Sequence, residues 1–183
     1  MTTINKAEAL PEPWLRGTFS GLPVLERALL HSLQMAQEDI CKWCGDLTNL
    51  EMHARPCELP SVAFQLRHIA RSLDRFCTYA EAAALTPEQL AALALETGEP
   101  GTRDAIFREF EESLDKTRRR LQTIIRQPLD LPVAIGRKRL PTTLGGLLVH
   151  AAEHTQRHVG QAITTSKVIR AQRDRQCDPS SPA

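Results

Sequence analysis

Four stretches of the chain, each longer than twenty residues, repeat apolar residues every three or four positions. That period places the apolar side chains on one face of an α-helix, and such a face must be buried against other helices. No stretch shows a convincing alternation of period two, as strands would. The four patterns cover residues 23–46, 61–84, 102–125 and 141–169. They predict an all-α protein built as a helical bundle.

Shorter signals lie between these patterns. Thr86 can cap a helix, Pro87 suits its first turn, and Glu88 adds an early acid, so a short extra helix is expected through Leu95 between the second and third long helices. Residues 128–141 contain Gly136 between short apolar pieces, which predicts a loop or a small hairpin before the last helix.

The length of 183 residues favours one domain, which we expect over residues 21–171. Residues 1–20 read as an extended N-terminal arm, and the polar residues 172–183 as a disordered C-terminal tail. Aromatic residues are only 4% of the chain, so the core must consist mainly of Leu, Ala, Ile and Val. Such a core favours helices over a sheet sandwich.

Charge and composition exclude several function classes. The 23 basic and 22 acidic residues give a net charge of +1, and with so few aromatic residues this argues against a nucleic-acid partner. No apolar run reaches the length of a membrane span, and the polar N-terminal residues contain no signal-peptide pattern. The odd number of five cysteines is then typical of a cytoplasmic protein with reduced thiols.

Three of the six histidines, His150, His154 and His158, fall within nine residues of the last pattern. Histidines four residues apart on a helix lie on one face, and two of them can bind one transition-metal ion if further ligands come from elsewhere. A helical wheel centred on Leu144 places His154 and His158 at the edge of the buried face, with His150 at its rim. The spacing favours a metal site at His154 and His158 over three unconnected histidines. His150 is then an outer partner or a surface residue.

Residues 147–161 contain these histidines followed by Gly160-Gln161, and they resemble the last-helix signature of the DinB/YfiT-like superfamily. That signature is His-x3-His followed closely by Gly-Gln. The stretch Leu66-Arg67-His68-Ile69-Ala70 resembles the region in which the family places its first metal-binding histidine. The resemblance covers about residues 20–171. It implies an antiparallel four-helix bundle with His68, His154 and His158 as metal ligands.

By this resemblance, the three histidines would hold one divalent metal ion, nickel or zinc, with open positions for water or substrate. Characterised relatives include S-transferases that use low-molecular-weight thiols such as bacillithiol or mycothiol, and a thiol-dependent maleylpyruvate isomerase. The resemblance therefore implies a metal-dependent thiol S-transferase or thiol-dependent isomerase that takes a small thiol and an electrophilic acceptor. It also implies a homodimer. The alternative is a non-catalytic metal-binding stress-response protein on the same scaffold.

Three further histidines and one acid are candidates for the site or its surroundings. His68 lies about 160° from the apolar stripe of its helix, so either that helix is buried on two sides or His68 faces solvent. His31 and His53 match no metal position of the family, and we interpret both as ordinary structural histidines. Glu153 is adjacent to the expected ligands but lies on the wrong side of the helix to act as a general base.

The segment Cys41-Lys-Trp-Cys44 has the CxxC spacing of a redox dithiol or of half a zinc site. A redox motif favours a strand-to-helix context, whereas this pair ends a helix. A zinc site needs further ligands, and only Cys57 and His53 lie near in sequence. We therefore interpret the pair as structural, and a thiol sensor through Cys41 and Cys44 is a weaker alternative function.

Two basic runs and a glycine pair complete the candidates. Residues 118–120 and 137–139 are interpreted as solvated faces, although the second run could instead flank the metal pocket and attract an anionic substrate. Gly145 and Gly146 would each cost about 1 kcal/mol relative to Ala inside a helix. We therefore expect a close helix–helix approach there, which is also a candidate dimer interface.

Overall fold

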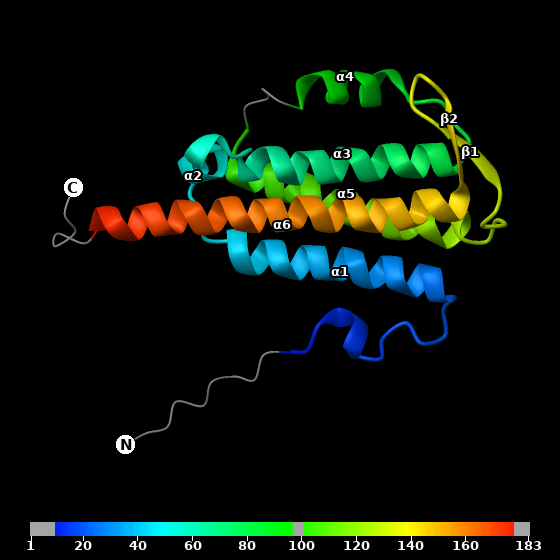
Figure 1. Cartoon of the computed structure of the whole chain (residues 1–183), viewed down its shortest axis with the longest axis horizontal. Coiled ribbons are helices and arrows are strands. Elements are labelled where there is room, and N and C mark those ends of the chain that lie inside the picture. Colours follow the sequence, from blue (N-terminus) through cyan, green and yellow to red (C-terminus); the bar gives the residue numbers. More distant parts are fainter. Residues whose placement is uncertain (1–9, 97–100, 178–183) are drawn as a thin grey trace.

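The computed structural model describes residues 10–96 and 101–177. Four long helices form a bundle, with a β-hairpin at one end and a short helix on the outside (Figure 1). The elements are η1 (Pro13–Leu15), α1 (Val24–Cys44), α2 (Asn49–His53), η2 (Pro56–Glu58), α3 (Val62–Ala80), α4 (Pro87–Leu95), α5 (Arg103–Ile124), β1 (Pro132–Ile135), β2 (Leu140–Thr143) and α6 (Leu144–Cys177). The prediction of an all-α bundle with a short extra helix, α4, is confirmed.

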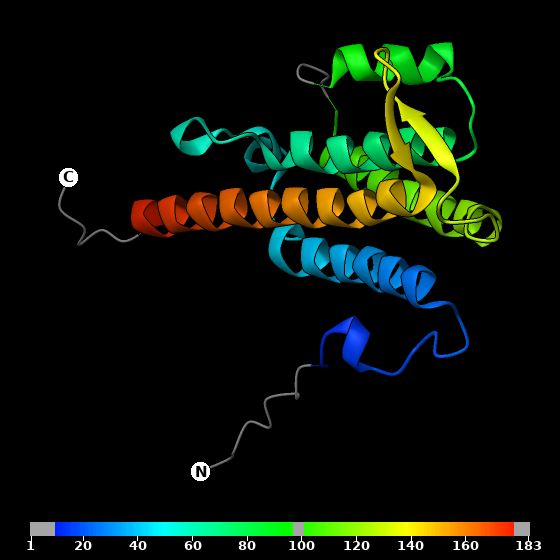
Figure 2. The ribbon, with the colours of Figure 1, turned by 45° about the vertical axis from the view of Figure 1, so that its right-hand side comes forward.

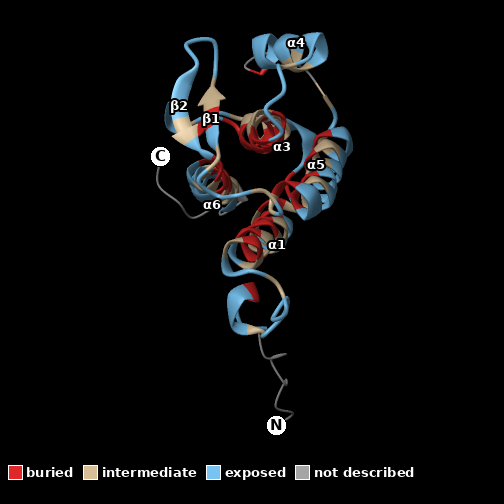
Figure 3. Ribbon diagram, turned by 90° about the vertical axis from the view of Figure 1, so that its right-hand side faces the viewer, coloured by how far each residue is buried: buried red, intermediate tan, exposed pale blue. Residues whose placement is uncertain are grey.

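The short helix α4 determines how the long helices are oriented. Because it carries the chain back along α3, helices α3 and α5 run in the same direction, opposite to α1 and α6 (Figure 1). Helix α6 packs against both α1 and α3, and α3 also packs against α5 and α4. The end-on view in Figure 3 shows α3 with α4 and the hairpin on its outer side. Helix α3 is therefore covered on more than one face.

The core follows the sequence prediction closely. Its buried side chains are mostly aliphatic, and Phe110 is the largest of the fully buried ones. The third long helix, α5, buries an apolar stripe at helical spacing: Ile106, Phe110, Leu114, Leu121 and Ile124. No helix in the described part of the chain is long and apolar enough to cross a membrane.

The prediction that the last helix begins at Pro141 is wrong. Residues 132–143 form an antiparallel hairpin in which Val133 pairs with Thr142, so Pro141 lies in strand β2. Helix α6 begins at Leu144, where the Thr143 hydroxyl accepts a 3.1 Å hydrogen bond from the backbone N–H of Gly146. A proline before two threonines suits the first turn of a helix and an edge strand equally well, so the residues alone did not distinguish them.

The glycine pair at the start of α6 contacts a loop, so the predicted helix–helix approach is wrong. The N–H of Gly145 donates to the Leu129 carbonyl at 2.7 Å, and a Cβ on Gly145 would lie 3.1 Å from that oxygen. A Cβ on Gly146 would lie 3.0 Å from Oγ1 of Thr142. The glycines therefore let the loop before the hairpin approach the first turn of α6 and satisfy its free N–H groups.

Helix α6 extends to Cys177, so the predicted disordered tail is wrong for residues 172–177. Arg170 and Arg173 form ion pairs with Asp46, and Arg173 also pairs with Glu51 at 3.5 Å. These contacts hold the polar last turns of α6 against the loop after α1. Residues 178–183 of the predicted tail lie outside the described residues.

The described part of the N-terminal arm is folded back on α1. Pro13 in η1 is buried, and Arg16 forms two hydrogen bonds with the Glu38 carboxylate, at 2.6 and 2.7 Å. The prediction of an extended arm is therefore wrong for residues 10–20. Residues 1–9 of the predicted arm lie outside the described residues.

Candidate metal centre

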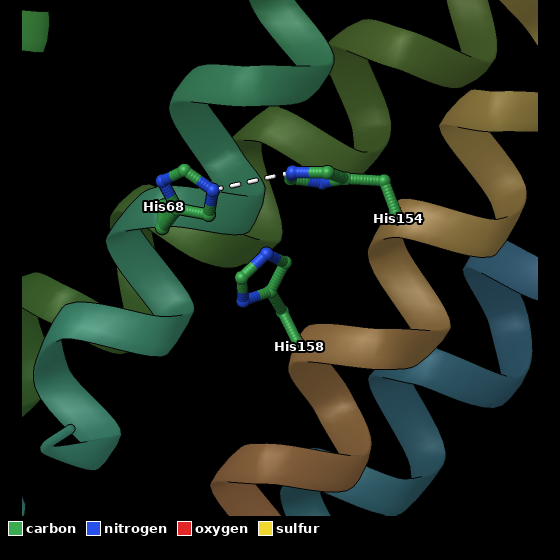
Figure 4. A group of neighbouring side chains, drawn as sticks. All are labelled: His68, His154 and His158. Carbon is green, nitrogen blue, oxygen red and sulfur yellow. Dashed lines mark hydrogen bonds between the residues drawn. The ribbon is translucent and has the colours of Figure 1, made fainter. Parts of the chain in front are cut away.

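The three histidines expected as ligands come together in the structure. His154 and His158 lie one turn apart on α6 and face His68 on α3 (Figure 4). The Nε2 atoms of His68 and His154 are 3.2 Å apart, and each residue offers one ring nitrogen within 4.8 Å of the others. Within the described residues, no other group of three His, Cys, Asp or Glu side chains has this geometry.

The position of His68 resolves the two alternatives left open by its helical wheel. Leu66 and Ile69 point into the core and are fully buried, whereas the His68 side chain is 20% exposed and faces α6. Helix α3 is therefore buried on more than one side, because α6 and α4 pack on it as well as α5. His68 is a polar residue between two helices and does not simply face solvent.

Glu96 fixes the ring of His68. Nδ1 of His68 lies 2.9 Å from Oε2 of Glu96, and Oε1 of Glu96 accepts a 2.7 Å hydrogen bond from Arg75. Because a carboxylate only accepts hydrogen bonds, Nδ1 of His68 carries the proton and Nε2 presents its lone pair to the other histidines. Burial raises the pKa of Glu96, but the hydrogen bonds from His68 and Arg75 outweigh it and lower the pKa overall. Glu96 therefore remains ionised beside His68.

Gln65 holds His158 in a similar way. Its Oε1 lies 2.6 Å from Nδ1 of His158, so the Nδ1–H group donates to the amide oxygen and Nε2 is left as the acceptor. Carboxylate or amide acceptors on the outer nitrogen are typical of metal-binding histidines, because they fix the tautomer and the ring orientation. Two of the three imidazoles are thus oriented for metal binding by residues of this chain.

His154 is positioned by packing. Its Nδ1 is buried and has no hydrogen-bond partner among the described residues, while the Phe76 ring meets the imidazole edge-on at 5.2 Å. Its Nε2 faces the lone pair of His68 Nε2. A cation bound between these nitrogens would replace the hydrogen bond that joins them with two metal–nitrogen bonds.

The donor set fits a divalent transition metal. Imidazole nitrogens bind zinc at about 2.0–2.1 Å, so two of them in a tetrahedral site lie about 3.3 Å apart. The observed 3.2 Å between the Nε2 atoms of His68 and His154 matches that spacing. Imidazole suits nickel and zinc alike, and three protein ligands leave positions for water or substrate, as in catalytic sites.

The electrostatics of the site favour neutral imidazoles. Burial, together with the neighbouring histidines, lowers the pKa of His154 to about 3. Burial and the proximity of His68 and Arg157 lower the pKa of His158 to about 4. Both residues are therefore neutral near pH 7, which is the form that binds metals.

These lowered pKa values predict acid sensitivity of the metal-free protein. Between pH 6.5 and 4 the unfolded chain binds protons at His154 and His158 that the folded chain does not, so the free energy of unfolding falls as the pH falls. With discounting for partial exposure, we expect a loss of about 1–2 kcal/mol between pH 7.5 and 5, measured by urea unfolding. A His154→Gln/His158→Gln double variant should lose most of this dependence. An unchanged pH dependence in the double variant would contradict the assignment.

The contact with Glu96 predicts an effect on metal affinity. Replacing Glu96 by alanine should weaken metal binding about 10- to 100-fold, because His68 loses the acceptor that fixes its ring. Competition with a chromophoric chelator measures the affinity. Glu88→Ala is the matched control, because Glu88 is exposed on α4, the helix that Glu96 follows, and hydrogen-bonds only near Thr86. Equal affinities of the Glu96→Ala variant and the wild type would contradict the role of Glu96.

Sequence reasoning missed both Gln65 and Glu96. Gln65 did give a signal, because it is a polar residue three positions before His68 on an otherwise apolar stretch of helix. Glu96 gave none, because it follows α4 and reaches His68 only through the tertiary fold.

Aromatic rings and a fourth histidine border the site. Phe64 stacks on His68 with ring centroids 5.4 Å apart, and Phe76 contacts both His150 and His154. His150 is exposed, and its ring centroid is 5.6 Å from that of His154, so it lies at the rim as predicted. Glu153 is exposed on α6, in agreement with the prediction that it faces away.

The remaining histidines have structural contacts. His31 is buried and lies 3.0 Å from the Thr18 hydroxyl, and Nε2 of His53 lies 2.8 Å from the carbonyl oxygen of Gly101. Neither belongs to the three-histidine cluster, which agrees with their interpretation as ordinary histidines.

The cysteine pair gives no support to a thiol sensor. Cys44 is buried at the end of α1, and burial raises the pKa of its thiol to about 11. A thiol with this pKa is almost entirely protonated near neutral pH and is a poor nucleophile. Cys41 and Cys57 are exposed, and no metal-binding group in the described ranges includes a cysteine.

The two basic runs have different surroundings. Arg120 is not simply solvated, because it bridges α5 to Asp74 at 3.0 Å and to Glu81 at 2.7 Å. Arg137 and Arg139 line a separate cavity at the hairpin, and no histidine lines that cavity. The suggestion that the second run flanks the metal pocket is therefore wrong.

Comparison with known proteins identifies the family to which the chain belongs. The sequence profile described as the DinB superfamily matches residues 32–162, which includes all three histidines and most of the bundle. No curated protein matches the chain. Since the profile covers well over half of the chain, the protein belongs to the DinB superfamily.

Proposed function

We propose that the chain binds one divalent metal ion, nickel or zinc, through the Nε2 atoms of His68, His154 and His158. The observation that carries this proposal is the convergence of the three imidazoles, two of which have their Nδ1 atoms held by Glu96 and Gln65. Ligands oriented in advance bind a metal more tightly, because less conformational freedom is lost on binding. Membership of the DinB superfamily supports the same ligand set.

We further propose that this centre serves a reaction of a low-molecular-weight thiol, either S-transfer to an electrophilic acceptor or a thiol-dependent isomerisation. A divalent cation in this place would lower the pKa of a bound thiol and make the thiolate available as a nucleophile. Glu96 and Arg75 would keep the proton on Nδ1 of His68 and leave Nε2 as a ligand. Phe64 and Phe76 would shield the two sides of the site from water. The active form is proposed to be a homodimer, by the resemblance to relatives.

One observation favours the non-catalytic alternative. A general base must be unengaged and within reach of the reacting group. Within the described residues, the carboxylate that contacts the histidines is Glu96, and it already binds His68 and Arg75. Glu153 is exposed and faces away. The lack of an unengaged carboxylate beside the histidines, in the part of the chain that the structure describes, is the arrangement expected of a metal-binding protein without catalytic activity.

Elemental analysis tests the first part of the proposal. Protein purified without an affinity tag should carry about one nickel or zinc ion per chain. Absence of metal after equilibration with both ions and removal of the excess would reject both the catalytic and the non-catalytic versions.

A thiol panel then separates these two versions. The metal-loaded chain is mixed with several small thiols and a chromogenic electrophile, and the rate of thioether formation is compared with that of the metal-stripped chain. Acceleration that depends on the metal and is lost in a His68→Ala variant supports the transferase. A metal-loaded chain that accelerates neither transfer nor isomerisation with any thiol supports the passive binder.

A further inference from the structure

A second cavity, of about 710 Å³, lies at the C-terminal end of α3, and we call it the hairpin pocket. Tyr79 at the end of α3 lines it, together with residues 82–85 and Leu90 on one side and residues of the β-hairpin between Pro132 and Pro141 on the other. Figures 2 and 3 show that the hairpin and α4 lie on the same side of α3, with the end of α3 beneath them. The walls of the pocket therefore come from three separate elements.

The hairpin pocket is separate from the metal centre. Its lining contains none of the six histidines. Tyr79 follows His68 by eleven residues on α3, which is about 16 Å along a helix. Any ligand of the hairpin pocket would therefore bind independently of the histidines.

Most of the lining is apolar. Leu85, Leu90, Val133 and several alanines and prolines contribute to it, and Leu90 is 44% exposed although its side chain is large and apolar. Small-molecule sites are typically cavities of about 300–1,000 Å³ with apolar walls and a few placed polar groups. The hairpin pocket fits this description in size and in composition.

The polar groups of the pocket are positively charged. Arg137 and Arg139 are its only charged lining residues, and neither forms an ion pair with another described residue. Lys138 lies between them in the turn but does not line the pocket. Glu81, the residue before Ala82, is already paired with Arg120 at 2.7 Å. Two arginines thus line an apolar cavity, and no carboxylate of the described residues forms an ion pair with them.

We propose that the hairpin pocket binds a small organic anion with an apolar body, of the class of medium-chain fatty acids. The carboxylate lies between Arg137 and Arg139, because guanidinium groups bind carboxylates through paired, charge-assisted hydrogen bonds. The hydrocarbon chain lies against Leu85 and Leu90, which removes their exposed apolar surface from water. The basic run at residues 137–139 thereby has a function, because two of its arginines bind the carboxylate of the ligand.

Titration of the full-length protein with octanoate tests the proposal, with calorimetry for affinity and amide chemical shifts for location. We expect saturable binding of one octanoate per chain, with shift changes centred on the hairpin and the start of α4. An Arg137→Gln/Arg139→Gln double variant should bind at least about tenfold more weakly. The matched control is Lys138→Gln, which removes a charge from the same turn and should change the affinity less than about twofold.

The apolar walls are tested by chain length. Affinity should rise from hexanoate to decanoate by up to about fourfold for each added methylene, and octanol should bind more weakly than octanoate. Because all three substituted residues are exposed, circular dichroism should show that the variants fold as the wild type does. Lack of saturation, equal binding by the double variant, or equally strong competition by inorganic phosphate would each overturn the proposal.

Discussion

A His154→Ala variant is expected to lose the metal almost completely, with less than about a tenth of the ion that the wild-type chain carries. His154 contacts both of the other ligands: its Nε2 atom is 3.2 Å from that of His68, and its ring centroid is 4.4 Å from that of His158. Without it, two imidazoles on different helices remain, and such a pair does not complete the three-ligand set of an open metal site. Elemental analysis after equilibration with nickel or zinc measures the loss.

The matched control for this substitution is His150→Ala. His150 lies on the same helix, one turn before His154, but it is exposed and does not belong to the three-histidine cluster. This variant should retain about one ion per chain. Metal at about 100 times its dissociation constant should stabilise the wild type and the His150→Ala variant by about 2.7 kcal/mol, and the His154→Ala variant much less. Full metal content in His154→Ala, or loss of metal in His150→Ala, would contradict the assigned ligands.

The part of the site on α6 was predictable because it depends only on local geometry. His154 and His158 share a face on any α-helix, and the buried residues Leu147 and Ala151 show which face that is. The bounds of the long helices were predictable for the same reason. The exceptions occur where local preference was overridden, as at Pro141, which lies in strand β2 and pairs with Ala134 in strand β1.

The position of His68 could not be decided from its helix alone. A helical wheel assumes one buried face, and by that assumption His68 points away from the core. Helix α3 has a second buried face because α6 and α4 pack on it. Which helices lie on which side of α3 is a property of the whole fold, so the residues of α3 allowed both alternatives.

The residues that orient the ligands were the least predictable. Gln65 is fully buried although it is polar, and this burial marks it once the structure is known. Glu96 reaches His68 from 28 residues further along the chain, and α4 places it there. Contacts of this kind have no periodicity in sequence, because each depends on how separate elements pack.

Replacing Phe110 by alanine is expected to lower the free energy of unfolding by about 3–5 kcal/mol. Phe110 is the largest of the fully buried side chains, 1% exposed, on the face of α5 that packs into the bundle. The loss includes the transfer of a ring out of the core and the cavity left in a close-packed interior. Urea unfolding of the metal-free protein measures it, so that metal binding does not contribute.

Phe107→Ala provides the comparison within the same helix. Phe107 is only half-buried, and the Arg103 guanidinium lies over its ring at 4.9 Å, so its removal should cost about 1 kcal/mol.

Because the metal ligands lie on α3 and α6, the Phe110→Ala variant should still bind one ion per chain at a temperature where it is folded. A variant that is destabilised and yet metal-competent would show that α5 stabilises the bundle without shaping the histidine cluster. A loss below about 1.5 kcal/mol would mean that the aliphatic neighbours collapse into the space, because partial relaxation of that kind is what reduces the energetic effect of a cavity.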